Sequence, residues 1–309
     1  VFSFEPFNIT LINFIILPIF FYLLVYIKKK SKSIYRKKPF KKNLFIFGTA
    51  FGFGFYLSGI HWITNSLTFD TSFKILIPFA LILLPLFLSL FISIVTLLIG
   101  PFLNLNLISI ILLSGGLSFS DYIRSKILTG FPWNLWAYSF SSSIEIIQIL
   151  NKIGLFAFNL ISITIFMLPA ILLVKTETFK KLISMTFMII IIFFFYIYGN
   201  YSINQNQLFL NSVKDNFYIK VISPNFKLEY GLSNKEIESR LLKLVKISDP
   251  DNLIKTIFVW PEGVFSGYSY NEILQFKKLL KKNFNKNHII LFGINRLDLE
   301  KNKFYNSLI

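Results

Sequence analysis

The first two thirds of the chain consist of long apolar segments separated by short polar loops. Six segments are apolar enough, and all but one long enough, to cross a bilayer as helices of about 20 residues. They are Ile9–Ile27, Leu44–Trp62, Ile75–Ile99, the shorter Leu105–Phe119, Ile153–Val174 and Leu182–Tyr198. None contains Lys, Arg, Asp or Glu, which argues against a transporter that relays charge. We expect residues 1–200 to form a transmembrane helical domain of about six spans.

After Asn200 the long apolar segments end, and short segments with the hydrophobic spacing of strands and amphipathic helices follow. Strands are expected at Phe217–Ile222, Thr256–Trp260, His288–Phe292 and Phe304–Ile309. A capping box at Ser233–Glu236 opens one amphipathic helix between them, and Asn271–Phe284 has the period of another. Alternating strands and helices predict a layered α/β domain in residues 201–309, which is incomplete because nothing follows its last strand.

The second of these predicted strands is followed by a proline. Thr256–Trp260 is followed by Pro261, which cannot donate to a strand ladder, so Glu262 is expected at the strand exit. Ligands of open α/β sheets bind at the carboxyl ends of strands. Glu262 is therefore a candidate catalytic carboxylate, and the alternative is a solvated loop glutamate.

The formal net charge of +17 is concentrated in a few places. The loop Lys28–Lys42 carries nine Lys and Arg residues, and most others lie in the C-terminal third. The positive-inside rule then predicts that this loop is cytoplasmic and that residues after Asn200 are outside. No basic groove with interleaved aromatic residues is visible, so a nucleic-acid partner is not expected.

Composition narrows the chemistry further. Hydrophobic residues make up 54% of the chain, and there is no cysteine. Disulfides, a thiolate nucleophile and a zinc–thiolate site are thereby excluded within these residues. Because residue 1 is Val and residues 303–309 resemble an unfinished strand, we expect a piece of a longer protein, truncated at both ends.

Two further motifs lie in or between the spans. The outer loop Thr129–Ser139, with Pro132 and Trp133, is rich in aromatic residues and is either an interface anchor or the wall of a lipid-binding cleft. Asp121 and Arg124 are expected to pair on one helix face just before it. In the second span, Gly48 and Gly52 have the spacing of close helix packing.

Taken in order, several short motifs resemble those of the bacterial apolipoprotein N-acyltransferases, membrane enzymes with a nitrilase-like (carbon-nitrogen hydrolase) domain. The likeness covers nearly the whole chain. The motifs are Phe4-Glu5-Pro6-Phe7, Phe51–Phe55 with Gly59–Ile63, Arg124 with Thr129–Trp133 and Tyr138-Ser139, Pro224-Asn225, Val259–Glu262, and Tyr305-Asn306-Ser307. The sequence departs from the family pattern at Gly263, where serine is common, and at Ser223, where glutamine is frequent. The tryptophan usually found downstream of Asn225 has no counterpart here.

The resemblance implies an αββα sandwich with a glutamate, lysine and cysteine triad, in which Glu262 is the general base. Lysine and cysteine would follow the Tyr305-Asn306 element, beyond this chain, so the chain alone is expected to be inactive. Trp260, Pro132, Trp133 and Asn306 are candidates to support the site, although Asn306 has the alternative of capping a turn at a strand end. No metal or cofactor is implied.

The implied reaction transfers a fatty acyl group from phospholipid, through a thioester acyl-enzyme, to the N-terminal diacylglyceryl-cysteine of an apolipoprotein. The implied location is the bacterial cytoplasmic (inner) membrane, multi-pass, with the catalytic domain on the periplasmic side. Two alternatives stay open: a membrane-tethered carbon-nitrogen hydrolase or amidase that gives the acyl group to water, and a non-catalytic membrane-anchored binding protein.

Overall fold

The chain divides into two compact units, Val1–Leu208 and Phe209–Ile309. The computed structural model describes residues 2–34, 40–68, 70–127, 130, 132–174, 177–212, 217–227, 229, 231–298, 301 and 303–309. Some residues of the predicted basic and aromatic loops lie outside the described residues, namely Arg36, Lys37, Lys38, Thr129 and Phe131.

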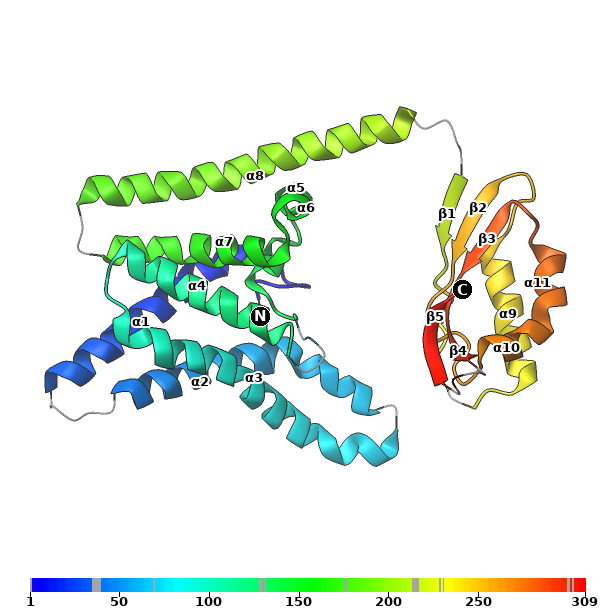
Figure 1. The fold of residues 1–309 in the computed structure, drawn as a ribbon, viewed down its shortest axis with the longest axis horizontal. Coiled ribbons are helices and arrows are strands. Elements are labelled where there is room, and N and C mark those ends of the chain that lie inside the picture. The colour runs from blue at the N-terminus through cyan, green and yellow to red at the C-terminus, as the bar shows by residue number, and fades with distance from the viewer. Residues whose placement is uncertain are drawn as a thin grey trace. The chain divides into compact units, whose positions relative to one another are not determined.

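The first unit is helical (Figure 1). Its long helices are α1 (Asn13–Ile34), α2 (Phe40–Ile60), α3 (Ile77–Ile99), α4 (Leu107–Arg124), α7 (Leu155–Met167) and α8 (Thr178–Ser212). Short helices lie between or beside them: η1 (Thr10–Ile12), η2 (His61–Thr68), η3 (Thr71–Leu76), η4 (Gly100–Phe102), η5 (Trp136–Phe140), α5 (Ile144–Ile147), α6 (Leu150–Ile153) and η6 (Leu168–Leu173). Six candidate membrane spans are found in the described residues, which confirms the predicted number.

The fourth span extends beyond the apolar segment that predicts it. The expected segment stopped at Phe119, whereas α4 continues to Arg124 and includes Asp121. Arg124 Nη2 donates to Asp121 Oδ1 at 3.0 Å, and both side chains are buried. Because the two charges compensate each other, the helix can continue through them.

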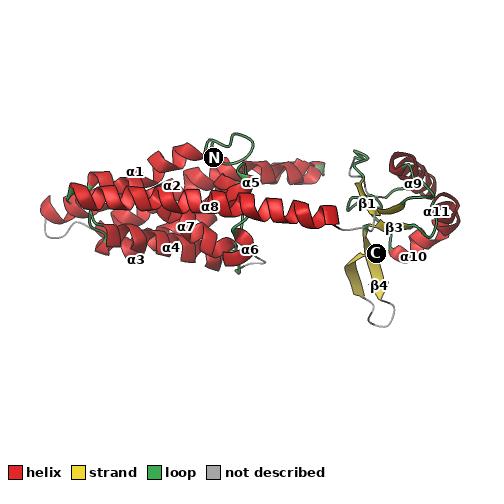
Figure 2. Cartoon of the chain, turned by 90° about the horizontal axis from the view of Figure 1, so that it is seen from above, coloured by secondary structure: helices red, strands yellow, loops and turns green. Residues whose placement is uncertain are grey.

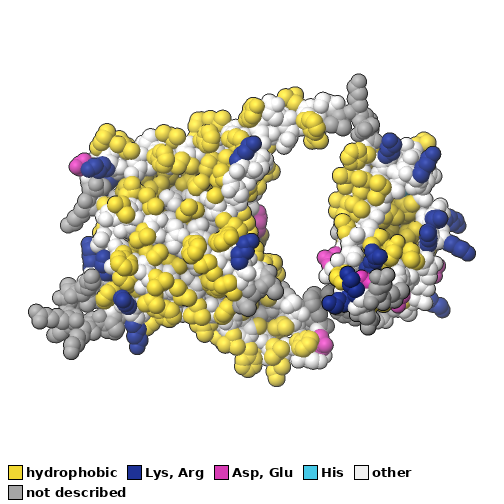
Figure 3. All heavy atoms as spheres, in the orientation of Figure 1, with side chains coloured by type: hydrophobic (Ala, Val, Ile, Leu, Met, Phe, Trp, Pro, Cys, Tyr) yellow, Lys and Arg dark blue, Asp and Glu magenta, His cyan; other side chains and the backbone are white. Residues whose placement is uncertain are grey.

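Apolar side chains cover much of the surface of the helical unit, as Figure 3 shows. On α8 alone, Ile189 is 61% exposed and Phe193 62%. Such a surface costs roughly 25 cal/mol per Å² in water but is accepted by lipid tails. We therefore describe this unit as a multi-pass membrane region.

Helices α2 and α3 pack closely through small residues. A Cβ at Gly52 would lie 3.0 Å from the Cα of Ser89. Polar side chains also join the two helices, since Thr49 Oγ1 and Ser93 Oγ are 2.8 Å apart and Thr96 Oγ1 donates to the carbonyl of Leu44 at 2.9 Å. The predicted packing role of these glycines is confirmed.

This contact gives a matched pair of substitutions. Gly52→Ala is expected to destabilise the helical unit by about 1–3 kcal/mol, because the added methyl group meets the α3 backbone. Gly54→Ala adds the same group on the same helix with nothing within 4 Å, so it is expected to be neutral or stabilising by up to about 1 kcal/mol. Thermal unfolding in detergent measures both. Equal midpoints for the two variants would contradict the packing.

In the described residues, all strands belong to the second unit (Figure 2). Strands β1 (Phe217–Val221), β2 (Lys255–Val259) and β3 (His288–Leu291) form a parallel sheet in the order β1-β2-β3. Helix α9 (Asn234–Ser248) connects the first two strands and begins at the predicted capping box. The predicted helix Asn271–Phe284 is divided into α10 (Tyr270–Ile273), η7 (Leu274–Phe276) and α11 (Lys277–Asn283).

Helices α9 and α11 lie on one side of this sheet in Figure 1. Their side of the core contains Leu241, Leu244 and Phe258, all 0% exposed. The alternate residues of the strands point to the other face, where Val221 is 76% exposed and Ile289 55%. In the described part of this unit, that face is apolar and its residues on β1 remain exposed.

A fifth strand, β4 (Gly293–Asp298), is absent from the sequence-based prediction. It pairs antiparallel with β5 (Lys303–Leu308) in a separate two-stranded sheet, with Asn295 opposite Asn306. Only Ile294 and Leu297 in β4 are strongly apolar, and they are three apart, so no two-residue alternation marks the strand.

Candidate functional site

Glu262 lies where the sequence predicts it, just beyond the carboxyl end of the central strand β2. The backbone N–H of Trp260 still bonds to the carbonyl of Leu291 at 2.8 Å, and the ladder stops at Pro261. Gly263 follows with a φ of 77°, in the left-handed region that glycine adopts at low cost. This conformation explains why a glycine suits position 263.

The Trp260 side chain anchors this turn in the core. Trp260 is 2% exposed and its ring packs against Phe265, Phe284 and Phe292. Its Nε1 donates to Ser248 Oγ at 3.0 Å. Trp260 therefore holds the backbone from which the exposed Glu262 side chain projects.

Glu262 lines a cavity of about 500 Å³ at this edge of the unit. Gly293, Asn295, Asn306 and Ser307, from the antiparallel pair β4 and β5, also line it. Asn306 lies inside β5 rather than at its end, so it does not cap a turn there. Two amides and one carboxylate thus surround a space large enough for a reacting group.

A second cavity of about 200 Å³ is also lined by Glu262. Its walls are the loop after β1, from Ser223 to Lys227, and the loop after β2, from Pro261 to Val264. In the described residues the ion pairs involve Asp121, Glu177 and Glu229, so the Glu262 carboxylate is not part of one. The Glu262 carboxylate can therefore be reached from both cavities.

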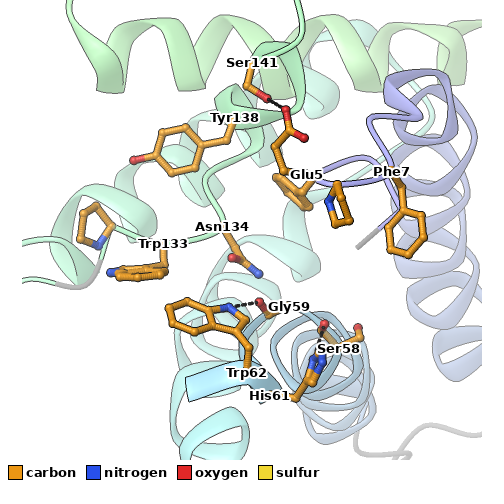
Figure 4. A pocket seen from close by; sticks show the side chains of 13 residues that line it. Glu5, Phe7, Ser58, Gly59, His61, Trp62, Trp133, Asn134, Tyr138 and Ser141 are labelled. Carbon is orange, nitrogen blue, oxygen red and sulfur yellow. Dashed lines mark hydrogen bonds between the residues drawn. The ribbon is translucent and has the colours of Figure 1, made fainter. Parts of the chain in front are cut away.

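The predicted Pro132 and Trp133 lie in the other unit, at an aromatic pocket of about 620 Å³ (Figure 4). The rings of Trp133 and Trp62 are 4.6 Å apart, and Glu5 and Tyr138 also line the pocket. Burial raises the pKa of the Tyr138 hydroxyl, so at neutral pH it stays protonated and can donate a hydrogen bond.

Buried polar groups hold the loop that carries Trp133. Arg124 Nη1 donates to the carbonyl of Trp133 at 2.8 Å, and Asp121 Oδ2 accepts from Asn159 Nδ2 at 3.0 Å. Asn159 Oδ1 in turn accepts from the backbone N–H of Ala137 at 3.0 Å. The expected Asp121–Arg124 pair is confirmed, and Asn159 is a member of the network that sequence reasoning missed. No local motif marks Asn159, because its partners lie 22 and 38 residues away.

Comparison with known proteins finds related sequences over most of the chain. Residues 1–168 match the family described as apolipoprotein N-acyltransferase N-terminal domain. A curated apolipoprotein N-acyltransferase from Rhodopseudomonas palustris is 25% identical over 290 residues, which cover 90% of this chain and 52% of the relative. Another from Rickettsia prowazekii is 31% identical over 250 residues, which cover 80% of this chain and 48% of the relative. The chain spans about half the length of these curated relatives. It belongs to the apolipoprotein N-acyltransferase family.

Proposed function

We propose that this chain supplies the membrane domain and the first part of the catalytic domain of a lipoprotein N-acyltransferase, with Glu262 as general base. The observation that carries the proposal is the Glu262 carboxylate at the exit of β2, beside the amides of Asn295 and Asn306 and outside every ion pair of the described residues. Curated relatives that cover most of the chain are named apolipoprotein N-acyltransferases.

In the proposed first step, Glu262 takes the proton of a cysteine thiol. The thiolate forms a bond to the acyl carbon of a phospholipid ester, the C–O bond breaks, and the lysophospholipid alcohol leaves with a proton. A lysine helps to stabilise the oxyanion of the intermediate. Because the chain contains no cysteine, the nucleophile of this scheme has to come from residues outside it.

In the second step, the free amine of an N-terminal diacylglyceryl-cysteine attacks the thioester. The C–N bond forms, the C–S bond breaks, and the cysteine sulfur takes a proton again. A covalent intermediate lets two lipid substrates use one site in turn. The aromatic pocket with Trp62 and Trp133 supports a lipid partner, since such residues favour the headgroup level of a bilayer.

The proposed architecture of the complete catalytic domain is an αββα sandwich. Its support is the uncovered apolar face of the sheet, with Ile219 60% and Val221 76% exposed. A second sheet packed on this face would remove it from water. The Lys28–Lys42 charge pattern favours a cytoplasmic position for that loop and a periplasmic position for the catalytic domain, in the inner membrane of a bacterium.

Incubation of the full-length protein with labelled phospholipid, with and without a diacylated lipopeptide, tests this function against hydrolysis. We expect the label to reach the lipopeptide amine, and fatty-acid release without lipopeptide to be slow. Fatty-acid release that is equally rapid with and without lipopeptide would instead identify a membrane-tethered hydrolase. No acyl transfer and no release would favour a binding protein.

A further inference from the structure

One buried cation outside the proposed triad connects the two loops that flank Glu262. Arg240, on α9, is 8% exposed. Its Nη1 donates to the carbonyl of Val264 at 3.3 Å, and its Nη2 donates to the carbonyl of Lys227 at 3.1 Å. The Arg240 guanidinium thus joins the loop after β1 to the loop after β2, and both loops line the smaller Glu262 cavity.

Two further contacts fix the orientation of this guanidinium. Nη2 is 2.9 Å from Glu229 Oε2, and the group lies over the Phe226 ring, 5.0 Å from its centroid. A planar guanidinium holds several acceptors in fixed directions, which a lysine ammonium cannot do. The contacts therefore determine where the two loops lie relative to α9.

Helix α9 holds the Glu262 turn at a second point. Ser248 accepts from the indole N–H of Trp260, two residues before Glu262, while Arg240 binds the carbonyl of Val264, two residues after it. The two helix positions are eight residues apart, or about 12 Å along a rigid helix. Glu262 thus projects from a short segment that is hydrogen-bonded to α9 on both sides. The strand ladder has already ended at this point, so it does not hold the segment.

We propose that Arg240 is a positioning residue that fixes Glu262 for proton transfer from the nucleophile. This inference rests on the proposed function, because it requires Glu262 to act as the base. Misplacing a catalytic group by about 1 Å can lower a rate by roughly 100-fold without weakening substrate binding. Arg240 does not have to touch either substrate to have this effect.

The test compares Arg240→Met, Arg240→Lys and Lys243→Met in the full-length protein. Lys243 is the matched control, since it lies on α9 like Arg240 and its Nζ is also 5.0 Å from the centroid of the Phe226 ring. Arg240→Met is expected to lower kcat about 10- to 100-fold per folded molecule, with KM for phospholipid and lipopeptide within about twofold. Arg240→Lys should recover part of the loss, and Lys243→Met should keep kcat within about twofold.

Wild-type kcat in Arg240→Met, or a loss confined to KM, would overturn the inference. Should Arg240→Met fail to accumulate as folded protein, Arg240→Lys decides: a lowered kcat supports the inference and a kcat within twofold of wild type overturns it.

A double variant separates this inference from the proposed function. If Arg240 acts through Glu262, then Glu262→Gln and Glu262→Gln/Arg240→Met have the same residual rate. If the rate of the double variant is lowered by the product of the two single losses, Arg240 acts independently of Glu262. That result would overturn the inference but not the proposed function. Full activity in Glu262→Gln would remove the proposed function itself, whereas an inactive Glu262→Gln with a fully active Arg240→Met would remove only the positioning role.

Discussion

Replacement of Glu262 by glutamine in the full-length protein is expected to slow acyl transfer to a diacylated lipopeptide by about 100-fold or more. Glutamine keeps the size of the side chain but cannot accept the thiol proton, and general-base catalysis typically contributes factors of about 10² to 10⁴. The side chain is exposed at the end of β2, so the substitution leaves the core untouched. Turnover of labelled lipopeptide by purified protein in detergent measures the effect.

Glu238→Gln is the control for this substitution. Glu238 is an exposed glutamate on α9 in the same unit, and it lines neither Glu262 cavity. Its replacement removes one carboxylate charge. Turnover is expected to stay within about twofold of the wild type, because an exposed charge contributes little energy to its surroundings. Equal turnover in Glu262→Gln and Glu238→Gln would reject the base assignment.

Replacement of Arg124 by glutamine is expected to destabilise the membrane region by about 3–5 kcal/mol. The change leaves the Asp121 carboxylate without its buried cation, which is among the costliest single losses in a protein interior. It also removes the donor to the Trp133 carbonyl, so the aromatic pocket should lose its fixed wall. Thermal unfolding in detergent, together with the yield of folded protein, measures the change.

An exposed pair at the same spacing is the control. Glu177 lies just before α8 and Lys180 lies in its first turn, so they are also three residues apart. Lys180 Nζ and Glu177 Oε1 are 3.2 Å apart, but the two side chains are 63% and 70% exposed. Lys180→Gln is expected to change stability by less than about 1 kcal/mol. The double variant Asp121→Asn/Arg124→Gln should be more stable than Arg124→Gln alone, because no buried charge is left unpaired. Similar losses for Arg124→Gln and Lys180→Gln would contradict this account.

The parts of the molecule that sequence predicts well are those with a local physical cause. Long apolar segments predict the spans because only helices can satisfy the backbone in lipid. Pro261 predicts the end of β2 and hence the place of Glu262, because proline lacks the N–H that a ladder needs. The capping box Ser233–Glu236 likewise predicts the start of α9.

Features with distant partners could not be predicted in the same way. Arg240 binds main-chain carbonyls 13 and 24 residues away, and any residue type supplies a carbonyl. The aromatic pocket combines residues near positions 5, 60 and 135, which only the packing of the spans brings together. Strand β4 has no alternating pattern because its pairing with β5, rather than burial of one face, defines it.

The most direct measurement of the central claim is formation of the acyl-enzyme without acceptor. Full-length protein would be incubated with phospholipid that carries a labelled acyl chain, and hydroxylamine-labile label on the protein would be followed over time. The account predicts rapid labelling of the wild type and labelling about 100-fold slower in Glu262→Gln, because the thiol proton has no base to accept it. Labelling of Glu262→Gln at the wild-type rate would contradict the role of Glu262 in the acyl-transfer step.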